Sequence, residues 1–133
     1  MTDREAREFL TRVFGTLFDP AASAEAVAAF FAPDYVQIAD GKRLDRAHFV
    51  DHVRVLKRAL ESGAVALEKV VASGSIVATR HVVSARKKDG TSVRFTVHAF
   101  FEIEGGSIRR TEELTHMLEG GAEDRDLGSR TAS

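Results

Sequence analysis

The sequence contains no cysteine and no tryptophan, a single tyrosine and only two prolines. Without cysteine, disulfides, thiolate metal sites and cysteine nucleophiles are excluded. The 19 lysines and arginines nearly balance the 20 aspartates and glutamates, so no basic excess favours a nucleic-acid surface. No apolar run approaches the roughly 20 residues that span a bilayer, and the charged N-terminus does not resemble a secretory signal. We therefore expect a cytoplasmic protein that binds neither nucleic acid nor membrane.

The chain is long enough for one domain with a real hydrophobic core. It has 133 residues, of which 44% are hydrophobic. The pattern of predicted elements places this single domain at residues 1–118. Residues 119–133 are rich in glycine, aspartate and serine, which predicts a mobile polar tail.

Helical patterns occupy the first half of the chain. Thr2 and Glu5 have the spacing of a capping box, and an apolar stripe with helical period follows them. Three helices are predicted: one from Thr2 to a stop at Asp19-Pro20, one over 23–31, and one over 46–61 that ends at Gly63.

Beyond Ala64 the apolar period changes from 3.6 to 2, which indicates strands. The predicted strands are 35–38, 64–71, 75–86, 91–103 and 108–118. Asp89-Gly90 is the strongest hairpin signal between them. Helices followed by hairpins predict an α+β fold, with helices packed on one face of a curved antiparallel sheet.

Strand alternation predicts which side chains face the interior. A two-residue turn at Asp89-Gly90 would place Arg80 inside the sheet and His81 beside His98 on the outer face. A loop longer by one residue would reverse this assignment, because each residue of register moves every side chain to the other face.

An inward Arg80 would need an acidic partner, since an isolated buried charge is costly. Glu112 and Glu113 are the candidates. A plain Gly105-Gly106 turn would point the Glu112 side chain inward, whereas a bulge would point the Glu113 side chain inward. The functional interpretation makes Glu113 an acid/base and Arg80 an electrostatic stabiliser, with Glu112 as the alternative carboxylate. The other interpretation is a structural ion pair.

The histidines have two interpretations each. His81 and His98 could form part of a metal site, but a catalytic zinc usually has three protein ligands, so a dimer interface or a half-exposed position on the outer sheet face is favoured. His48 and His52 are four apart on the third helix and have no placed third ligand, which indicates a solvated helix face. No metal site and no cofactor is predicted.

The interior is expected to be apolar, because nine phenylalanines accompany the single tyrosine. If a cavity remains, its ligand is expected to be small and mainly apolar with one polar group. The side chains predicted to line such a cavity and bind the ligand are Phe14, Tyr35, Gln37, Val97 and Phe101.

The order of elements resembles the nuclear-transport-factor-two-like superfamily in its SnoaL-like branch, which includes relatives of ketosteroid isomerase and limonene epoxide hydrolase. The resemblance spans about Glu5 to Gly120, through "FFAPDYVQIADGKRL", "DRAHFVDHVRVLKRAL", "ATRHVVSARKKDGTSVRFTVHAFFEI" and "GGSIRRTEELTHML". It implies a cone-shaped sheet wrapped around the N-terminal helices, a single pocket and often a homodimer.

The resemblance also implies positions for the catalytic groups of those enzymes. Glu113 and Arg80 match one acid and the arginine of the epoxide hydrolase set, while Val82 stands at its second acid. The base of the isomerase matches Ala39, with Asp40 one residue further on.

Three functions are compatible with the sequence. The first is a small-molecule-binding pocket protein. The second is an isomerase, cyclase or hydratase that uses Glu113 and Arg80. The third is a non-catalytic dimeric structural or partner-binding domain.

Overall fold

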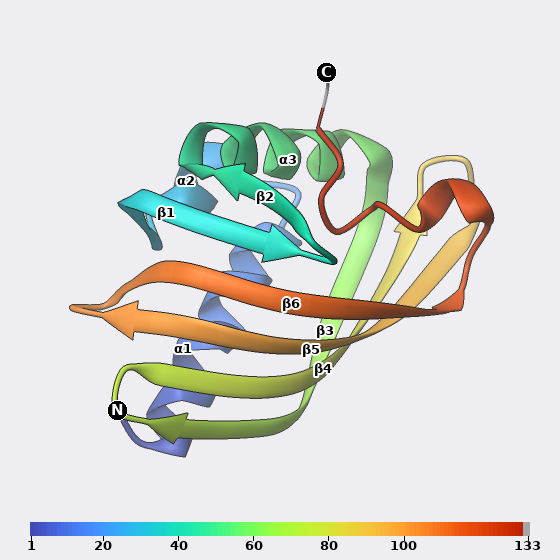
Figure 1. Cartoon of the computed structure of the whole chain (residues 1–133). Helices are drawn as coiled ribbons and strands as arrows, with labels where there is room; N and C mark the ends of the chain where they lie inside the picture. Colours follow the sequence, from blue (N-terminus) through green and yellow to red (C-terminus); the bar gives the residue numbers. More distant parts are fainter. Residues whose placement is uncertain (132–133) are drawn as a thin grey trace.

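The computed structural model of the chain describes residues 1–131, which fold around one curved sheet. Figure 1 shows its helices and strands. In chain order they are α1 (Asp3–Leu17), α2 (Ala24–Ala28), β1 (Phe31–Ala39), β2 (Lys42–Asp45), α3 (Arg46–Ala59), β3 (Leu60–Ser73), β4 (Ile76–Lys87), β5 (Ser92–Glu104), β6 (Ser107–Glu119) and the short 3-10 helix η1 (Ala122–Asp124). The α+β prediction is confirmed.

The predicted capping residues begin the helices. Thr2 Oγ1 accepts a hydrogen bond from the Glu5 N–H over 3.1 Å, and the Glu5 carboxylate accepts one from the Thr2 N–H over 2.9 Å. A cap of this kind stabilises a helix by about 1 kcal/mol. Ser23 caps α2 and Asp45 caps α3 in the same manner.

The strands lie in the order β2-β1-β6-β5-β4-β3. All neighbours are antiparallel except β1 and β6, which run parallel. The short strand β2 and this parallel pair were not predicted. The pair joins residues more than 70 positions apart, a relationship that local periodicity does not report.

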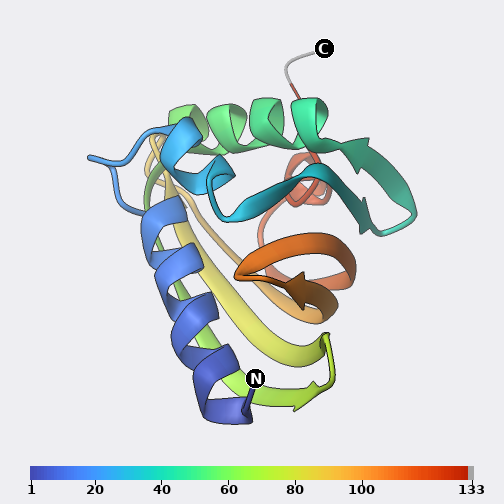
Figure 2. The same ribbon diagram turned by 90° about the vertical axis from the view of Figure 1, so that its left-hand side faces the viewer.

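The helices cover the concave side of the sheet. In Figure 2, α1 and α3 stand inside the curve of the long strands. The alternation predicted for β5 is confirmed, since Phe95, Val97, Ala99, Phe101 and Ile103 are all buried. They pack with apolar side chains of α1 and α3 into one core.

Gly63 has a packing role rather than the predicted capping role. Helix α3 ends at Ala59, so Gly63 lies within β3. A Cβ atom at Gly63 would lie 2.3 Å from Cδ1 of Phe18. The missing side chain therefore lets the end of α1 pack against the bent start of β3.

The β4–β5 register differs from the prediction by one residue. Lys87 pairs with Thr91 through a 2.8 Å backbone hydrogen bond, leaving a three-residue loop where a two-residue turn was expected. His81 consequently lies opposite Val97, and Arg80 lies opposite His98. The prediction that Arg80 points inward and His81 outward is therefore wrong.

The β5–β6 pair contains the bulge that was one of the two predicted alternatives. Ile103 pairs with Ile108, but Glu102 pairs with Arg110, so Arg109 is the additional residue. This shift places Glu113 opposite Ala99 on the concave side and leaves Glu112 exposed.

The packed part of the chain extends beyond residue 118. After β6 the chain turns back toward α3 (Figure 1), and Asp124 and Leu127 are buried. This segment was predicted to be a polar tail; its expected mobility stays a prediction. Across residues 1–131, no helix combines the length and the apolar character needed to cross a bilayer.

Candidate functional site

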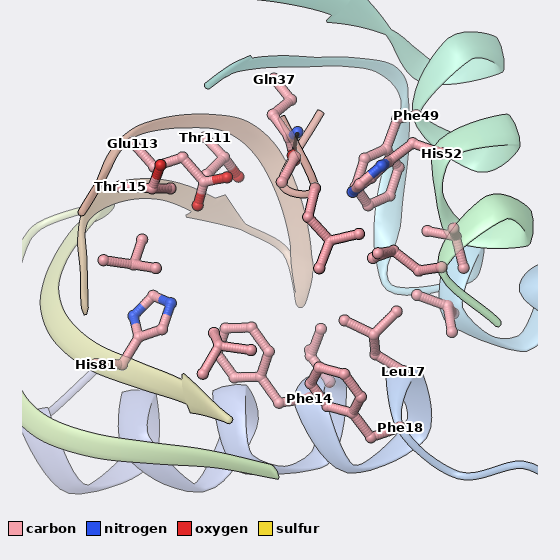
Figure 3. Close-up of a pocket in the computed structure, with 18 of the residues that line it drawn as sticks. Phe14, Leu17, Phe18, Gln37, Phe49, His52, His81, Thr111, Glu113 and Thr115 are labelled. Carbon is pink, nitrogen blue, oxygen red and sulfur yellow. Dashed lines mark hydrogen bonds between the residues drawn. The ribbon is translucent and has the colours of Figure 1, made fainter. Parts of the chain in front are cut away.

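A cavity of about 140 Å³ lies between the concave face of the sheet, the helices and the C-terminal segment. Seventeen of its lining residues are apolar, and most of these come from α1, α3, β4 and β5. The polar side chains around it are Tyr35, Gln37, His52, His81, Thr111, Glu113 and Thr115. Figure 3 shows several of these polar groups on different sides of one open centre.

Glu113 brings a carboxyl group to this cavity from β6. The carboxyl makes no hydrogen bond and no ion pair with another residue in the range 1–131. Burial, followed by the nearby charge of Asp40, raises its pKa to about 7. The group can therefore both accept and donate a proton near neutral pH.

Asp40 lies beside Glu113 in the turn after β1. It is the one non-glycine residue within 1–131 with a positive φ, 51°. Its carboxylate accepts a 2.8 Å hydrogen bond from the Thr115 N–H and a second from the Thr115 hydroxyl. These bonds hold the Asp40 carboxylate in place next to Glu113.

Tyr35 and Gln37 form a buried polar chain on β1. The Tyr35 hydroxyl donates to Thr111 Oγ1 over 2.7 Å and lies 3.4 Å from Gln37 Oε1. Gln37 Nε2 donates to the carbonyl of Gly128 over 3.2 Å. Burial raises the pKa of Tyr35 above its ordinary value, so the hydroxyl stays protonated.

His81 faces the cavity from β4 and is 2% exposed. Its Nδ1 lies 2.9 Å from Thr79 Oγ1, and its ring lies next to those of Phe14 and Phe101. Burial, with a smaller contribution from His98, lowers its pKa to about 4. The imidazole is therefore neutral at pH 7.

His52 reaches the cavity from α3 and is 4% exposed. Its Nδ1 lies 2.8 Å from the carbonyl oxygen of Arg130. A carbonyl only accepts, so Nδ1 carries the proton and Nε2 carries a lone pair. Burial lowers the pKa of His52 to about 4, and this ring is neutral as well.

The C-terminal segment supplies one wall of the cavity. Leu127 and Gly128 line it, and the Arg130 carbonyl accepts the His52 hydrogen bond. The segment is tied to β4 by an ion pair between Lys87 Nζ and Asp124 Oδ1, 2.8 Å apart.

The predicted pair of Glu113 and Arg80 does not form. The Arg80 side chain is 49% exposed on the outer face and pairs with Glu68 at 3.2 Å. The alternative carboxylate, Glu112, also points outward, where it pairs with Arg110 at 2.8 Å. No arginine or lysine of the described chain lines the cavity.

The five predicted ligand-binding residues, Phe14, Tyr35, Gln37, Val97 and Phe101, all line the cavity. Their role in binding stays a prediction. His81 and His98 lie on opposite faces of the sheet, so the proposed joint role of this pair in an outer-face interface is wrong.

Two buried histidines were missed as cavity residues. His52 was assigned to a solvated helix face, yet it lies three residues after Phe49 and four before Leu56, within the apolar stripe of α3. That spacing was the available signal. His81 had no such signal, because its side of the sheet depends on the hairpin loop length. Residues 1–131 hold no cluster of three or more metal-ligating side chains.

Within residues 1–131, helices close one side of a curved sheet over a cavity, and this arrangement defines the class of the fold. The family model for the SnoaL-like domain matches residues 6–111, and the chain belongs to this family. An uncharacterized protein of Schizosaccharomyces pombe is 33% identical over 126 residues, which cover 95% of this chain and 97% of that protein.

Solved structures share the fold at low sequence identity. An NTF2-like protein of unknown function from Exiguobacterium sp. 255-15 has a TM-score of 0.69 at 16% identity, over 81% of this chain and 98% of that one. An LEH-like epoxide hydrolase from M. tuberculosis has a TM-score of 0.61 at 19% identity, over 80% and 76% of the two chains. The nuclear-transport-factor-two-like fold expected from the sequence is confirmed.

Proposed function

We propose that this chain binds a small, mainly apolar molecule in the cavity and that Glu113 transfers a proton to or from it. The observation that carries the proposal is the carboxyl of Glu113, which has no hydrogen-bond or ion-pair partner among residues 1–131 and lies in a mainly apolar cavity. An ionised carboxyl in such a place lowers stability, which a purely structural role does not explain. Such perturbed groups cluster at functional sites.

The supported chemistry is proton transfer of the isomerase, cyclase or hydratase type, without Arg80. The epoxide hydrolase set has no support here, because both Arg80 and Val82 belong to the outer-face positions of β4. A cavity of about 140 Å³ is comparable to engineered protein cavities that bind benzene. The ligand is therefore a compact ring or short chain.

Ligand-induced changes in the NMR chemical shifts of isotope-labelled protein methyl groups test the binding. We expect cyclohexanol, added at millimolar concentration, to shift the methyl resonances of Val97 and Leu127. The variant Val97→Phe fills the cavity and removes the shift at Leu127. Thr96→Phe, one residue away on the outer face, is the matched control and preserves it. Unchanged pocket methyls in the wild type would remove the binding proposal.

We also propose that two copies associate through the outer sheet face. Phe100 on β5 and Leu114 on β6 are 58% and 69% exposed there, and Leu118 is exposed further along β6. Such a row of apolar side chains on neighbouring strands is typical of an interface. We propose a second copy of the chain as the partner that covers this face, as the family resemblance implies. The cytoplasmic location stays a prediction.

The mass of the particle in solution tests this association. We expect a dimer by light scattering, and a monomer for the double variant Phe100→Ser with Leu114→Ser at unchanged secondary structure. Glu8→Ala, on the exposed side of α1, serves as the control and leaves the mass unchanged. A wild-type monomer at high micromolar concentration would contradict the proposal.

A further inference from the structure

Besides Glu113, two buried imidazole nitrogens face the cavity without a partner. Nε2 of His81 and Nε2 of His52 make no hydrogen bond to residues 1–131. Among residues 1–131, Arg46 Nε is the only side-chain polar atom that lacks a partner and is also completely enclosed by protein atoms. The two histidine nitrogens lack a partner but are not completely enclosed, so each adjoins open space. Both residues are more than nine-tenths buried and line the cavity, so these nitrogens open onto it.

The two nitrogens have opposite hydrogen-bonding character. The hydroxyl of Thr79 has one side-chain partner, Nδ1 of His81. If the hydroxyl donates to Nδ1, its proton is satisfied; in the reverse arrangement that proton is buried without an acceptor, at a cost of about 1–3 kcal/mol. The first arrangement leaves the His81 proton on Nε2, which is then a donor. At His52 the Arg130 carbonyl fixes the proton on Nδ1, so its Nε2 is an acceptor.

The donor and the acceptor come from different walls. His81 stands on β4, two strands away from Glu113 on β6, which corresponds to about 10 Å between strand backbones. Figure 3 shows Glu113 on one side of the open centre, His81 on another and His52 on the side of α3. The three groups therefore line different walls of the same cavity.

The charge of the walls restricts the ligand further. Both imidazoles are neutral at pH 7, and no lysine or arginine among the described residues lines the cavity. An anionic ligand would stand beside Glu113 and Asp40 without a cation to compensate it. An uncharged molecule has no such cost.

We propose that the ligand is an uncharged compound with two oxygen functions, one accepting from His81 Nε2–H and the other donating its hydroxyl proton to His52 Nε2. A hydroxyketone or a vicinal diol on a small hydrocarbon has this chemistry. The inference rests on the proposed function of the same cavity and assigns His81 and His52 as the residues that determine specificity.

Nitrogen NMR of the ligand-free protein tests the tautomers first. We expect the proton of His81 on Nε2 and that of His52 on Nδ1. The opposite tautomer at either ring would overturn this inference and leave the role of Glu113 unaffected.

Binding of four probes then tests the ligand class at pH 7.5. We expect 2-hydroxycyclohexanone and cyclohexane-1,2-diol to bind about tenfold more tightly than cyclohexanol, the effect of one additional neutral hydrogen bond. Cyclohexanecarboxylate should bind at least tenfold more weakly than cyclohexanol. Equal affinities for all four probes, or preference for the carboxylate, would overturn the inference. Absence of binding by every probe would instead remove the proposed function, and this inference with it.

Paired variants separate hydrogen bonding from folding. An Asn side chain places its amide near Nδ1 of a histidine, and a Gln side chain places it near Nε2. His81→Gln retains the donor and should retain the affinity for the diol, whereas His81→Asn retains the contact with Thr79 and should lose about tenfold. His52→Asn keeps the bond to Arg130 and should also lose about tenfold. Equal affinity of His81→Asn and His81→Gln for the diol would contradict the assignment.

Discussion

The backbone N–H of Asp40 donates to the carbonyl of Glu113 over 3.0 Å, and this bond holds the turn that follows β1 beside β6, with one carboxyl group on each. The two groups have different environments. Asp40 accepts two hydrogen bonds from Thr115, whereas the Glu113 carboxyl accepts none within residues 1–131. The charge of Asp40 is the second cause, after burial, of the raised pKa of Glu113.

Replacing Asp40 by asparagine should lower the pKa of Glu113. The change Asp40→Asn removes the negative charge, and asparagine tolerates the positive φ at this position. The pKa should remain above the ordinary value of 4.5, because burial is the larger cause. Carbon NMR of the carboxyl groups measures it. Asp34→Asn, which breaks an exposed ion pair with Arg109, is the control and should leave Glu113 unchanged.

Removing the carboxyl should stabilise the protein at alkaline pH. The pKa of Glu113 rises from 4.5 to about 7 on folding, so its stabilising contribution is complete below pH 4.5 and is lost as the pH rises through 7. Relative to the wild type, Glu113→Gln should gain roughly 3 kcal/mol between pH 4 and pH 9. Urea denaturation across this range measures the difference. The control is Glu112→Gln, which removes an exposed carboxyl. Its difference in unfolding free energy from the wild type should not change between pH 4 and pH 9.

The buried histidines should make the protein sensitive to acid. Their pKa values fall from 6.5 to about 4 on folding, so their contribution is complete above pH 6.5 and is lost as the pH falls toward 4. Each ring accounts for roughly 3 kcal/mol of this loss. His81→Gln should lose less stability than the wild type between pH 7 and pH 4.

The exposed His98 provides the matched control for this measurement. His98→Gln should lose nearly as much stability on acidification as the wild type, because His98 is the smaller of the two causes of the lowered His81 pKa. An identical acid response of His81→Gln and His98→Gln would show that His81 is not buried in its neutral form.

Shortening Leu127 should destabilise the whole domain. Its side chain is buried in the core cluster and lines the cavity, so Leu127→Ala should cost about 2–4 kcal/mol. Val71→Ala removes apolar atoms from a position on β3 that is 57% exposed, and it should change stability by less than about 0.5 kcal/mol. Equal effects of the two variants would mean that residues 121–131 do not pack on the domain in solution.

Local signals predicted much of the fold and part of the site. The capping box at Thr2 and Glu5, the alternation along β5 and the inward set of Phe14, Val97 and Phe101 follow from short-range periodicity and are all present. These features depend on neighbouring residues in the sequence.

The polar half of the site depends on relationships that sequence spacing leaves open. Because the loop after Lys87 has one residue more than predicted, His81 faces the cavity and Arg80 faces outward. The bulge at Arg109 determines that Glu113, and not Glu112, faces inward. The packing of Leu127 is a long-range contact in a segment of polar composition. A single leucine among mainly glycine and polar residues does not indicate burial.

The pKa of the Glu113 carboxyl in the wild-type protein is the most direct test of the central claim, that this group faces an apolar cavity without a partner. Carbon NMR over pH 3–10, with Glu113→Gln to identify the resonance, measures it. The account predicts a midpoint near pH 7 for this one resonance. A midpoint at the ordinary value of 4.5 would contradict it, because the carboxyl would then be solvated or paired and unsuited to the proton transfer proposed here.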